Sequence, residues 1–328
     1  MHFIGADVSK LTIDIAYFYQ ATKCWTSPCK VRNIKSGWNK LIRTVEKQTR
    51  APCEAICIVM EATSVYHLKA AAYLTREGLN VIVANPGRAA QYAQSQNRQN
   101  KTDPLDAKSL QRYGSNLEKF HWFTPNSPEI SELKTLLSRL RQLGKDLQRE
   151  RNRLEKSAFL EASTLLRVSL RRSIRITIKE QKWIQAHIDK LIASNAKLER
   201  DQQLMCSIKG IGKTTSQWLL PLLSDQRFNN AREVGAFLGL VPCHKTSGTT
   251  LKKGSRLTGR GDADLRARLY MPAMSAARTD PEMRAFYQAL LAKGKPKKVA
   301  LIAVMRKLTH LCYGVVKNQT PYQANYAT

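Results

Sequence analysis

The sequence predicts a mixed α/β domain at residues 1–126, a pair of long helices at 127–203 and a mainly α-helical domain at 204–328. Short apolar segments alternate with helical patterns in the first part, which is typical of an α/β fold. Leucine and isoleucine recur at helical spacing in the second part. In the third part, glycines that mark turns separate the helical segments.

The first part begins with the pattern of a β-hairpin. In "HFIGADVSKLTIDIAYFY" two apolar runs flank a polar turn at Ser9 and Lys10. "EAICIVME" then predicts a buried strand, and "SVYHLKAAAYLTREG" predicts a helix that ends at Gly78. "LNVIVANP" predicts a further strand, ended by Pro86. Strands in this order around a helix favour a mixed sheet.

A helix is expected to begin within "NKTDPLDAKSL", residues 100–110. Thr102 or Asp103 can cap it, and Pro104 suits its first position. Asp103 and Asp106 then share one face of the helix. A lone pair of this kind caps the helix and compensates its dipole in most proteins. A catalytic role therefore depends on whether further carboxylates join the pair.

A coiled-coil spacing of leucines runs through residues 133–154, and a similar spacing runs through residues 184–198. Gly144 and Arg151 interrupt the first run. The two runs predict two long antiparallel helices that form at least part of a coiled coil. Packing of these helices on a neighbouring domain explains the same spacing equally well.

The segment "SIKGIGKTTSQWLLPLL" near the start of the third part has two interpretations. It approximates the phosphate-binding loop GxxxxGK[ST], with Gly212, Lys213 and Thr214 in place but with Ser207 where the first glycine belongs. Because the preceding strand pattern is weak, we prefer a turn between two helices that contains Gly210 and Gly212. Such a turn is similar to helix-hairpin-helix motifs, which present backbone amides to a DNA phosphate. ATPase activity is not expected.

A basic segment, "CHKTSGTTLKKGSRLTGRGDA", follows and is expected to be a flexible loop. "DLRARLYMPAMSAAR" and "KVALIAVMRKLTHLCYGVV" predict helices after it.

Charge is the strongest compositional signal. The chain has 54 Lys and Arg against 25 Asp and Glu, a net charge of +29. Residues 204–328 hold 20 basic and 6 acidic side chains, which makes this part the strongest candidate for binding phosphates. Such an excess predicts a polyanionic partner. Nucleic acid fits better than a membrane surface, since no long amphipathic basic helix lies at a terminus.

Neither a signal peptide nor a membrane span is expected. The start "MHFIGADVSK" lacks a basic region followed by an apolar run, and runs such as "VALIAVM" are too short to cross a bilayer. The seven cysteines include no CxxC pair, so neither a disulfide framework nor a zinc site is predicted. We expect a cytoplasmic protein.

Two further carboxylates join the pair on the predicted helix. Asp7 lies within the first strand, and Glu61 lies at the end of the apolar strand "ICIVM". An acid at the end of a buried strand is costly unless it is paired or binds a metal. Carboxylate oxygens suit Mg²⁺, and two such ions can clamp the attacking and leaving oxygens of a phosphodiester. Lys101 and Lys108 beside the pair are then expected to contact nucleic acid.

The four carboxylates lie in motifs that resemble the DEDD tetrad of RuvC-like nucleases, which have the ribonuclease H fold. These motifs are "IGADVSK" with Asp7, "MEAT" with Glu61, and "NKTDPLDA" with Asp103 and Asp106. Over nearly the whole chain, including "GIGKTTS" and "GLVPCHKTSGTTLKKGSR", the sequence resembles the insertion sequence 110 family of DEDD transposases, the bridge-RNA-guided recombinases.

This resemblance implies a RuvC-like N-terminal domain, a coiled-coil middle and a C-terminal transposase domain with a nucleophilic serine. By its position in the motif, that serine is Ser247. The residues themselves leave the choice open, because phosphate contact explains most hydroxyls of this segment. The other hydroxyls belong to Thr246, Thr249, Thr250, Ser255 and Thr258.

The resemblance also implies cofactors and partners. The tetrad would hold Mg²⁺, two ions per active site, and a bridge RNA would pair with donor and target double-stranded DNA. The chain would form a homo-oligomer in which dimers assemble into a tetramer, so that serine and tetrad meet between subunits. The candidate contacts to nucleic acid are Lys101, Lys108, Gly210, Gly212, Lys213, Lys252, Lys253 and Arg256.

Two other functions fit parts of the sequence. A hydrolytic RuvC-like Holliday-junction resolvase or nuclease would use the same tetrad with water as nucleophile, which leaves the basic segment with a binding role alone. A non-catalytic nucleic-acid-binding protein would explain the charge and treat the acids as helix caps. Metal dependence separates the last function from the other two, and a covalent protein–DNA adduct separates the recombinase from the nuclease.

Overall fold

The structure, a computed structural model, describes residues 1–19, 23–26, 29–62, 64–96, 103–160, 163–224, 228–247, 251–257 and 261–323. For residues 103–104, 243–247 and 251–256 it describes the helix or strand but not the side chains. Two compact units, Met1–Pro125 and Asn126–Thr328, make up the chain, and each has its own core. The further boundary at residue 203 stays a proposal.

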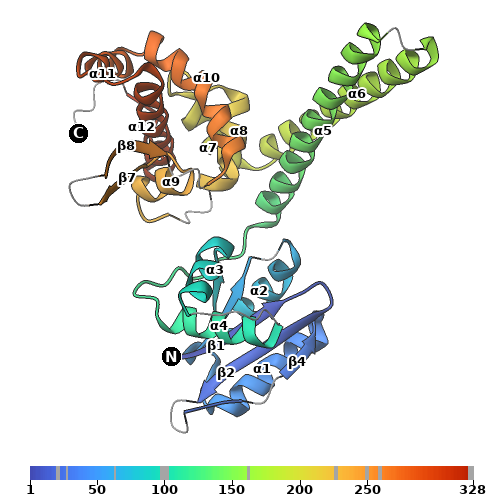
Figure 1. Cartoon of the computed structure of the whole chain (residues 1–328), viewed down its shortest axis with the longest axis vertical. Coiled ribbons are helices and arrows are strands. Elements are labelled where there is room, and N and C mark those ends of the chain that lie inside the picture. Colours follow the sequence, from blue (N-terminus) through green and yellow to red (C-terminus); the bar gives the residue numbers. More distant parts are fainter. Residues whose placement is uncertain are drawn as a thin grey trace. The chain divides into compact units, whose positions relative to one another are not determined.

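A mixed six-stranded sheet forms the centre of the first unit (Figure 1). Its strands are β1 (His2–Val8), β2 (Thr12–Tyr19), β3 (Cys24–Trp25), β4 (Cys29–Arg32), β5 (Ile56–Glu61) and β6 (Asn80–Ala84). Their order is β3-β2-β1-β5-β6, and β4 also pairs with β2. β1 and β2 form an antiparallel hairpin, whereas β5 and β6 run parallel to β1. The predicted hairpin and mixed sheet are confirmed.

Helices cover both faces of this sheet. They are α1 (Lys35–Thr49), α2 (Tyr66–Arg76), α3 (Pro86–Ser95) and α4 (Asp103–Ser115), with a short 3₁₀ helix at Cys53–Ala55. Because side chains alternate along a strand, Ile4 and Ile58 pack in one core with residues of α1 and α2. Val59 points to the opposite side and packs with Ala89 of α3 and Leu110 of α4. We call this second side the α4 face.

Two glycines let α4 lie directly against β1. A Cβ added at Gly5 would lie 1.8 Å from the carbonyl oxygen of Ala107, so only glycine permits this approach. A Cβ added at Gly114 would lie 2.4 Å from Cγ2 of Val59 in β5 and 3.3 Å from the ring of Phe3 in β1. α4 therefore runs back along β1, with its first turn toward the carboxyl end of the strand.

Two long helices, α5 (Pro128–Phe159) and α6 (Thr164–Ala193), begin the second unit and pack side by side (Figure 1). The prediction of two long helices here is confirmed. Leu137 in the first half of α5 and Ile188 in the second half of α6 belong to the same core as the helices that follow. These halves thus pack on a neighbouring core, as the second interpretation of the leucine spacing requires. A coiled coil over the remaining halves stays a proposal.

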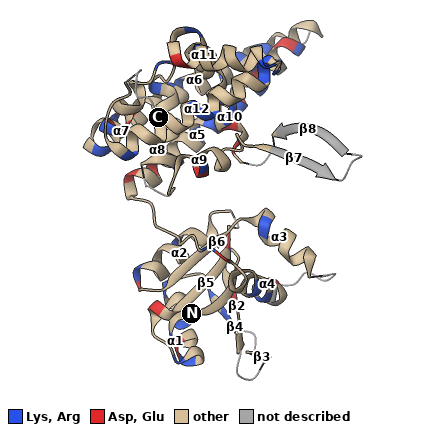
Figure 2. Cartoon of the chain, turned by 90° about the vertical axis from the view of Figure 1, so that its left-hand side faces the viewer, with Lys and Arg blue, Asp and Glu red and all other residues tan. Residues whose placement is uncertain are grey.

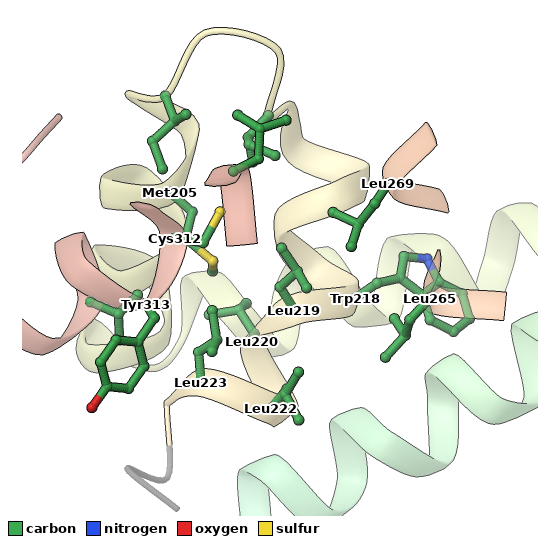
Figure 3. Close-up of a cluster of buried hydrophobic side chains, with 14 of the residues drawn as sticks. Met205, Trp218, Leu219, Leu220, Leu222, Leu223, Leu265, Leu269, Cys312 and Tyr313 are labelled. Carbon is green, nitrogen blue, oxygen red and sulfur yellow. The ribbon is translucent and has the colours of Figure 1, made fainter. Parts of the chain in front are cut away.

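Six shorter helices and a hairpin complete the described residues of the second unit. They are α7 (Ala196–Cys206), α8 (Lys213–Leu223), α9 (Ala231–Phe237), β7 (Pro242–Ser247), β8 (Leu251–Leu257), α10 (Ala263–Thr279), α11 (Pro281–Ala292) and α12 (Lys297–Asn318). Figure 3 shows Leu219 and Leu220 of α8 among side chains of the neighbouring helices, including Met205 and Cys312. Among the helices of the described residues, only α12 is long and apolar enough to cross a membrane. Of its most apolar window, 56% is buried in this core.

The basic segment after α9 is a β-hairpin, so the expectation of a flexible loop was wrong for residues 242–247 and 251–257. β7 and β8 pair antiparallel, with an irregularity between Cys243 and Lys245. The lysines made the segment look like a solvated loop. A two-stranded ribbon can be solvated on both faces, however, and then needs no alternation of apolar and polar residues to pair its backbone.

Candidate active site

The carboxyl ends of two adjacent parallel strands carry the first two predicted carboxylates. Ala6 of β1 pairs with Met60 of β5, so Asp7 and Glu61 are the next residues in this register. Neighbouring strands lie about 4.8 Å apart, and residues at matching positions point to the same face. Asp7 and Glu61 therefore lie beside each other on the α4 face. Each is half-buried and has a polar or electrostatic partner.

The helix that carries the other two carboxylates lies over the same face. α4 begins at Asp103, as predicted, and Asp106 lies in its first turn, half-buried and with a polar or electrostatic partner. Ala107 of α4 lies over Gly5 of β1, and Asp103 precedes Ala107 by about one helical turn. On β1, Asp7 follows Gly5 by two residues and points to the same face of the sheet. The first turn of α4 is thus directed toward the strand end that carries Asp7.

The donor set fits a divalent ion that prefers oxygen ligands. All four predicted ligands are carboxylates, which suits Mg²⁺. Among the described side chains, however, no three His, Cys, Asp or Glu residues are grouped closely enough to hold one ion. The side chain of Asp103 lies outside that set. The structure therefore places Asp7 and Glu61 side by side and orients α4 toward them. Asp106 is not close enough to this pair to form a three-residue metal site.

A further carboxylate lies on this face, and sequence reasoning missed it. Asp14 of β2 is the direct cross-strand partner of Asp7 and is 7% exposed. Its Oδ2 forms an ion pair with Nζ of Lys30 in β4, at a distance of 3.1 Å. In the sequence, "TIDIAY" shows only that an aspartate interrupts an apolar strand. The residue opposite Asp14 depends on the pairing register of the two strands, which the sequence does not reveal.

One predicted nucleic-acid contact of the first unit has a described neighbour. Lys108 Nζ lies 5.2 Å from the centre of the Trp25 ring, and Arg112, one turn further along α4, lies 5.4 Å from it. This edge of the α4 face is thus basic and aromatic, a combination that suits nucleotides. Lys101 lies outside the described residues.

Ser247 is the last residue of β7, opposite Leu251 of β8, and so lies at the distal end of the hairpin. Lysines face each other across the strands: Lys245 pairs with Lys253 in the register. Lys252 and Arg256 also lie on β8, and the side chains of all these residues are outside the description. Like charges directly opposite one another destabilise a ribbon unless an anion offsets them.

The N-terminus of α10 is held by ion pairs that sequence reasoning also missed. Asp262 caps α10 by accepting from the backbone amide of Leu265 at 3.1 Å, and it accepts from Arg141 of α5 at 3.1 Å. Arg141 also pairs with Asp264 at 3.1 Å. Burial alone would raise the pKa of Asp262, but the Leu265 amide and the Arg141 guanidinium outweigh it and lower the pKa. The start of α10 is therefore fixed to the long helix α5.

The Gly-Ile-Gly segment joins two helices, as preferred from the sequence. Helix α7 precedes it where a phosphate-binding loop would need a strand. Gly210 has φ +96°, and Gly212 is the N-cap of α8 without a side-chain cap. Lys213 Nζ pairs with Asp189 of α6 at 3.0 Å, so this predicted nucleic-acid contact has a carboxylate beside it.

Comparison with known proteins joins both units to one group of enzymes. A DEDD family model of the IS110 type, described as a transposase, matches residues 4–161. A second model, described as a transposase of the IS116/IS110/IS902 family, matches residues 202–288.

Individual proteins also match this chain. The pilin gene-inverting protein of Moraxella bovis is 29% identical over 323 residues, 98% of this chain and 97% of the relative. Its counterpart from Moraxella lacunata gives the same values. An uncharacterised 43.6 kDa protein of insertion element IS110 from Streptomyces coelicolor is 24% identical over 157 residues, 48% of this chain and 38% of that protein. The chain therefore belongs to the IS110 family of transposases, enzymes that recombine DNA.

Proposed function

We propose that this transposase cuts and exchanges DNA strands at a Mg²⁺-binding DEDD centre on a RuvC-like, ribonuclease-H-type domain. One observation carries the proposal: Asp7 and Glu61 lie side by side at the ends of parallel strands, under a helix that begins with Asp103 and Asp106. A sheet in which a β-hairpin is continued by two parallel strands supports the RuvC-like assignment. Two Mg²⁺ ions held by these four carboxylates would offset the negative charge of the reacting phosphodiester.

Ser247 is the proposed nucleophile. Its Oγ forms a bond to phosphorus and loses its proton, while the bond from phosphorus to the 3′ oxygen breaks and that oxygen takes up a proton. The resulting 3′-hydroxyl later attacks the phosphorus of a neighbouring serine adduct, and that serine leaves with a proton. Each step exchanges one phosphodiester bond for another, so no high-energy cofactor is consumed.

Ser247 and the carboxylates belong to different units of the chain. We propose that copies of the chain assemble as dimers and then as a tetramer, in which the serine of one copy works with the carboxylates of another. Lys245 and Lys253 occupy paired positions in the register of β7 and β8, which supports a DNA backbone as the neighbour of Ser247, since a polyanion would offset two like charges at such positions.

A structured bridge RNA is the proposed source of sequence specificity. It would pair with donor and target double-stranded DNA, while the protein contacts backbone and shape. The net charge of +29 supports such a partner, and basic side chains occur on helices of both units (Figure 2). The site of action is then the cytoplasm, which holds the chromosome in prokaryotes.

Substitution of the helix carboxylates tests the metal centre. Asp103→Asn and Asp106→Asn should each lower the rate of strand cleavage at least about 100-fold, because transition-state charge is no longer offset. RNA binding should stay within about twofold of wild type, a range set by small surface effects. Asp146→Asn is the matched control, since Asp146 is exposed on α5 and pairs there with the exposed Arg149. Full cleavage by both tetrad variants would remove the proposed centre.

Inversion of a DNA segment is a second candidate outcome of the same chemistry. The relative that matches 98% of this chain is named a pilin gene-inverting protein. Inversion and transposition differ in how two DNA sites are arranged, not in the bonds that are exchanged. A plasmid with two inverted copies of the element junction distinguishes them, because only an inverting enzyme reverses the segment between the copies.

A further inference from the structure

A continuous row of charged residues crosses four strands on the α4 face. In the register, Lys30 of β4 pairs with Asp14 of β2, and Asp14 pairs with Asp7 of β1. Glu61 of β5 is the neighbour of Asp7 on the adjacent parallel strand, one position beyond the Ala6–Met60 pair. The tetrad uses Asp7 and Glu61 and leaves Asp14 and Lys30 without a role.

Asp14 is buried, whereas its ion-pair partner is exposed. The side chain of Asp14 is only 9% exposed, whereas that of Lys30 is 53% exposed, with 3.1 Å between Nζ and Oδ2. Water screens the lysine more than the aspartate, so the pair leaves part of the negative charge uncompensated. Directly opposite residues have Cβ atoms about 5 Å apart, at which distance Asp14 and Asp7 repel each other. A cation bound at Asp7 would reverse the sign of that interaction.

We propose that Asp14 and Lys30 set the affinity of the carboxylate centre for its divalent ion. Asp14 is a positioning residue that adds negative potential beside Asp7 and so favours the ion. Lys30 opposes this effect and stabilises the metal-free sheet by pairing with Asp14. The inference rests on the proposed metal centre and goes beyond the tetrad itself.

The two substitutions should change metal affinity in opposite directions. Asp14→Asn removes a charge beside Asp7, and affinity for Mn²⁺ should fall about tenfold or more, the range found when outer-shell partners of metal sites are lost. Lys30→Gln leaves Asp14 uncompensated, so affinity should rise several-fold while the melting temperature of the metal-free protein falls. An ion pair that only joins two strands would give unchanged affinity in both variants.

The test is a calorimetric titration of the full-length chain with Mn²⁺, together with thermal unfolding in EDTA. Lys30→Arg keeps the charge and should behave as wild type, which keeps the test valid if Lys30→Gln unfolds. Lys47→Gln is the matched lysine control, because Lys47 is exposed on α1, the helix on the opposite face of the sheet.

The variant Asp7→Asn distinguishes a failure of the proposed metal centre from a failure of the role proposed for Asp14 and Lys30. If wild type binds Mn²⁺, Asp7→Asn abolishes binding, and Asp14→Asn and Lys30→Gln shift affinity in opposite directions, the role of the pair is supported. If Asp7→Asn abolishes binding but both other variants bind as wild type, the role of the pair is overturned and the metal centre stands. If Asp7→Asn binds as wild type, the metal centre fails and the inference fails with it.

Discussion

Gly5 determines how close the proposed catalytic helix comes to the sheet. The carbonyl oxygen of Ala107 occupies the space where any other residue would place its Cβ. This approach directs the first turn of α4, which holds Asp103 and Asp106, toward the end of the strand that carries Asp7. Gly5 has no side chain of its own, yet the position of the carboxylates on α4 depends on it.

Gly5→Ala should destabilise the first unit by about 1–3 kcal/mol, the cost of overpacking a fitted contact. The added methyl group would meet backbone atoms of Ala107, which cannot move without shifting the helix. Gly144→Ala in α5 is the control, since its added Cβ would have its nearest neighbour at 3.8 Å and alanine favours a helix interior. Urea unfolding measures both. Equal stability of Gly5→Ala and wild type would contradict this packing.

At the scale of elements, the sequence predicts the first unit better than the second. Pro104 marks the start of α4 because its ring fixes φ, and Gly78 marks the end of the helix before β6 because glycine readily adopts the positive φ found there, +91°. The hairpin of β7 and β8 escaped prediction because its lysines hide the strand pattern. The contact of Arg141 with Asp262 joins residues 121 positions apart, and such pairs depend on the tertiary fold.

Of the site, the sequence indicates the carboxylates but not their register. Asp7 lies within one apolar strand and Glu61 ends another, which is visible in the sequence. That Asp14 lies opposite Asp7 follows from strand pairing, and a shift of one residue would turn it to the other face.

The anchor at the start of α10 predicts a pH-dependent contribution to stability. Asp262→Asn keeps a good N-cap but loses the ion pair with Arg141, so it should cost about 0.5–1 kcal/mol at pH 7. The folded-state pKa of Asp262 is lowered, so this contribution is complete above the unfolded pKa of about 4 and is lost as pH falls through the folded pKa. Urea unfolding at pH 7 and at pH 3 checks it. The same difference from wild type at both pH values would contradict the role of the ion pair.

At the scale of the whole molecule, the net charge of +29 should dominate binding to nucleic acid. Affinity for double-stranded DNA should fall about 10³-fold or more between 50 and 200 mM salt, as expected when six or more phosphates are neutralised. Lys252→Gln combined with Lys253→Gln should reduce the slope of log K against log salt by about two, if both contact phosphates. Fluorescence anisotropy measures these slopes. A slope near zero in wild type would contradict an electrostatic DNA interface.

The most direct test of the account is a denaturing gel that detects a covalent protein–DNA adduct. Purified protein with its co-purifying RNA, Mg²⁺ and labelled element-junction DNA is compared with Ser247→Ala and with Thr246→Ala, its neighbour on β7. We predict a slowly migrating band in wild type and in Thr246→Ala that is absent in Ser247→Ala. Cleaved DNA without an adduct, together with an active Ser247→Ala, would contradict the serine mechanism and leave a hydrolytic nuclease that uses water.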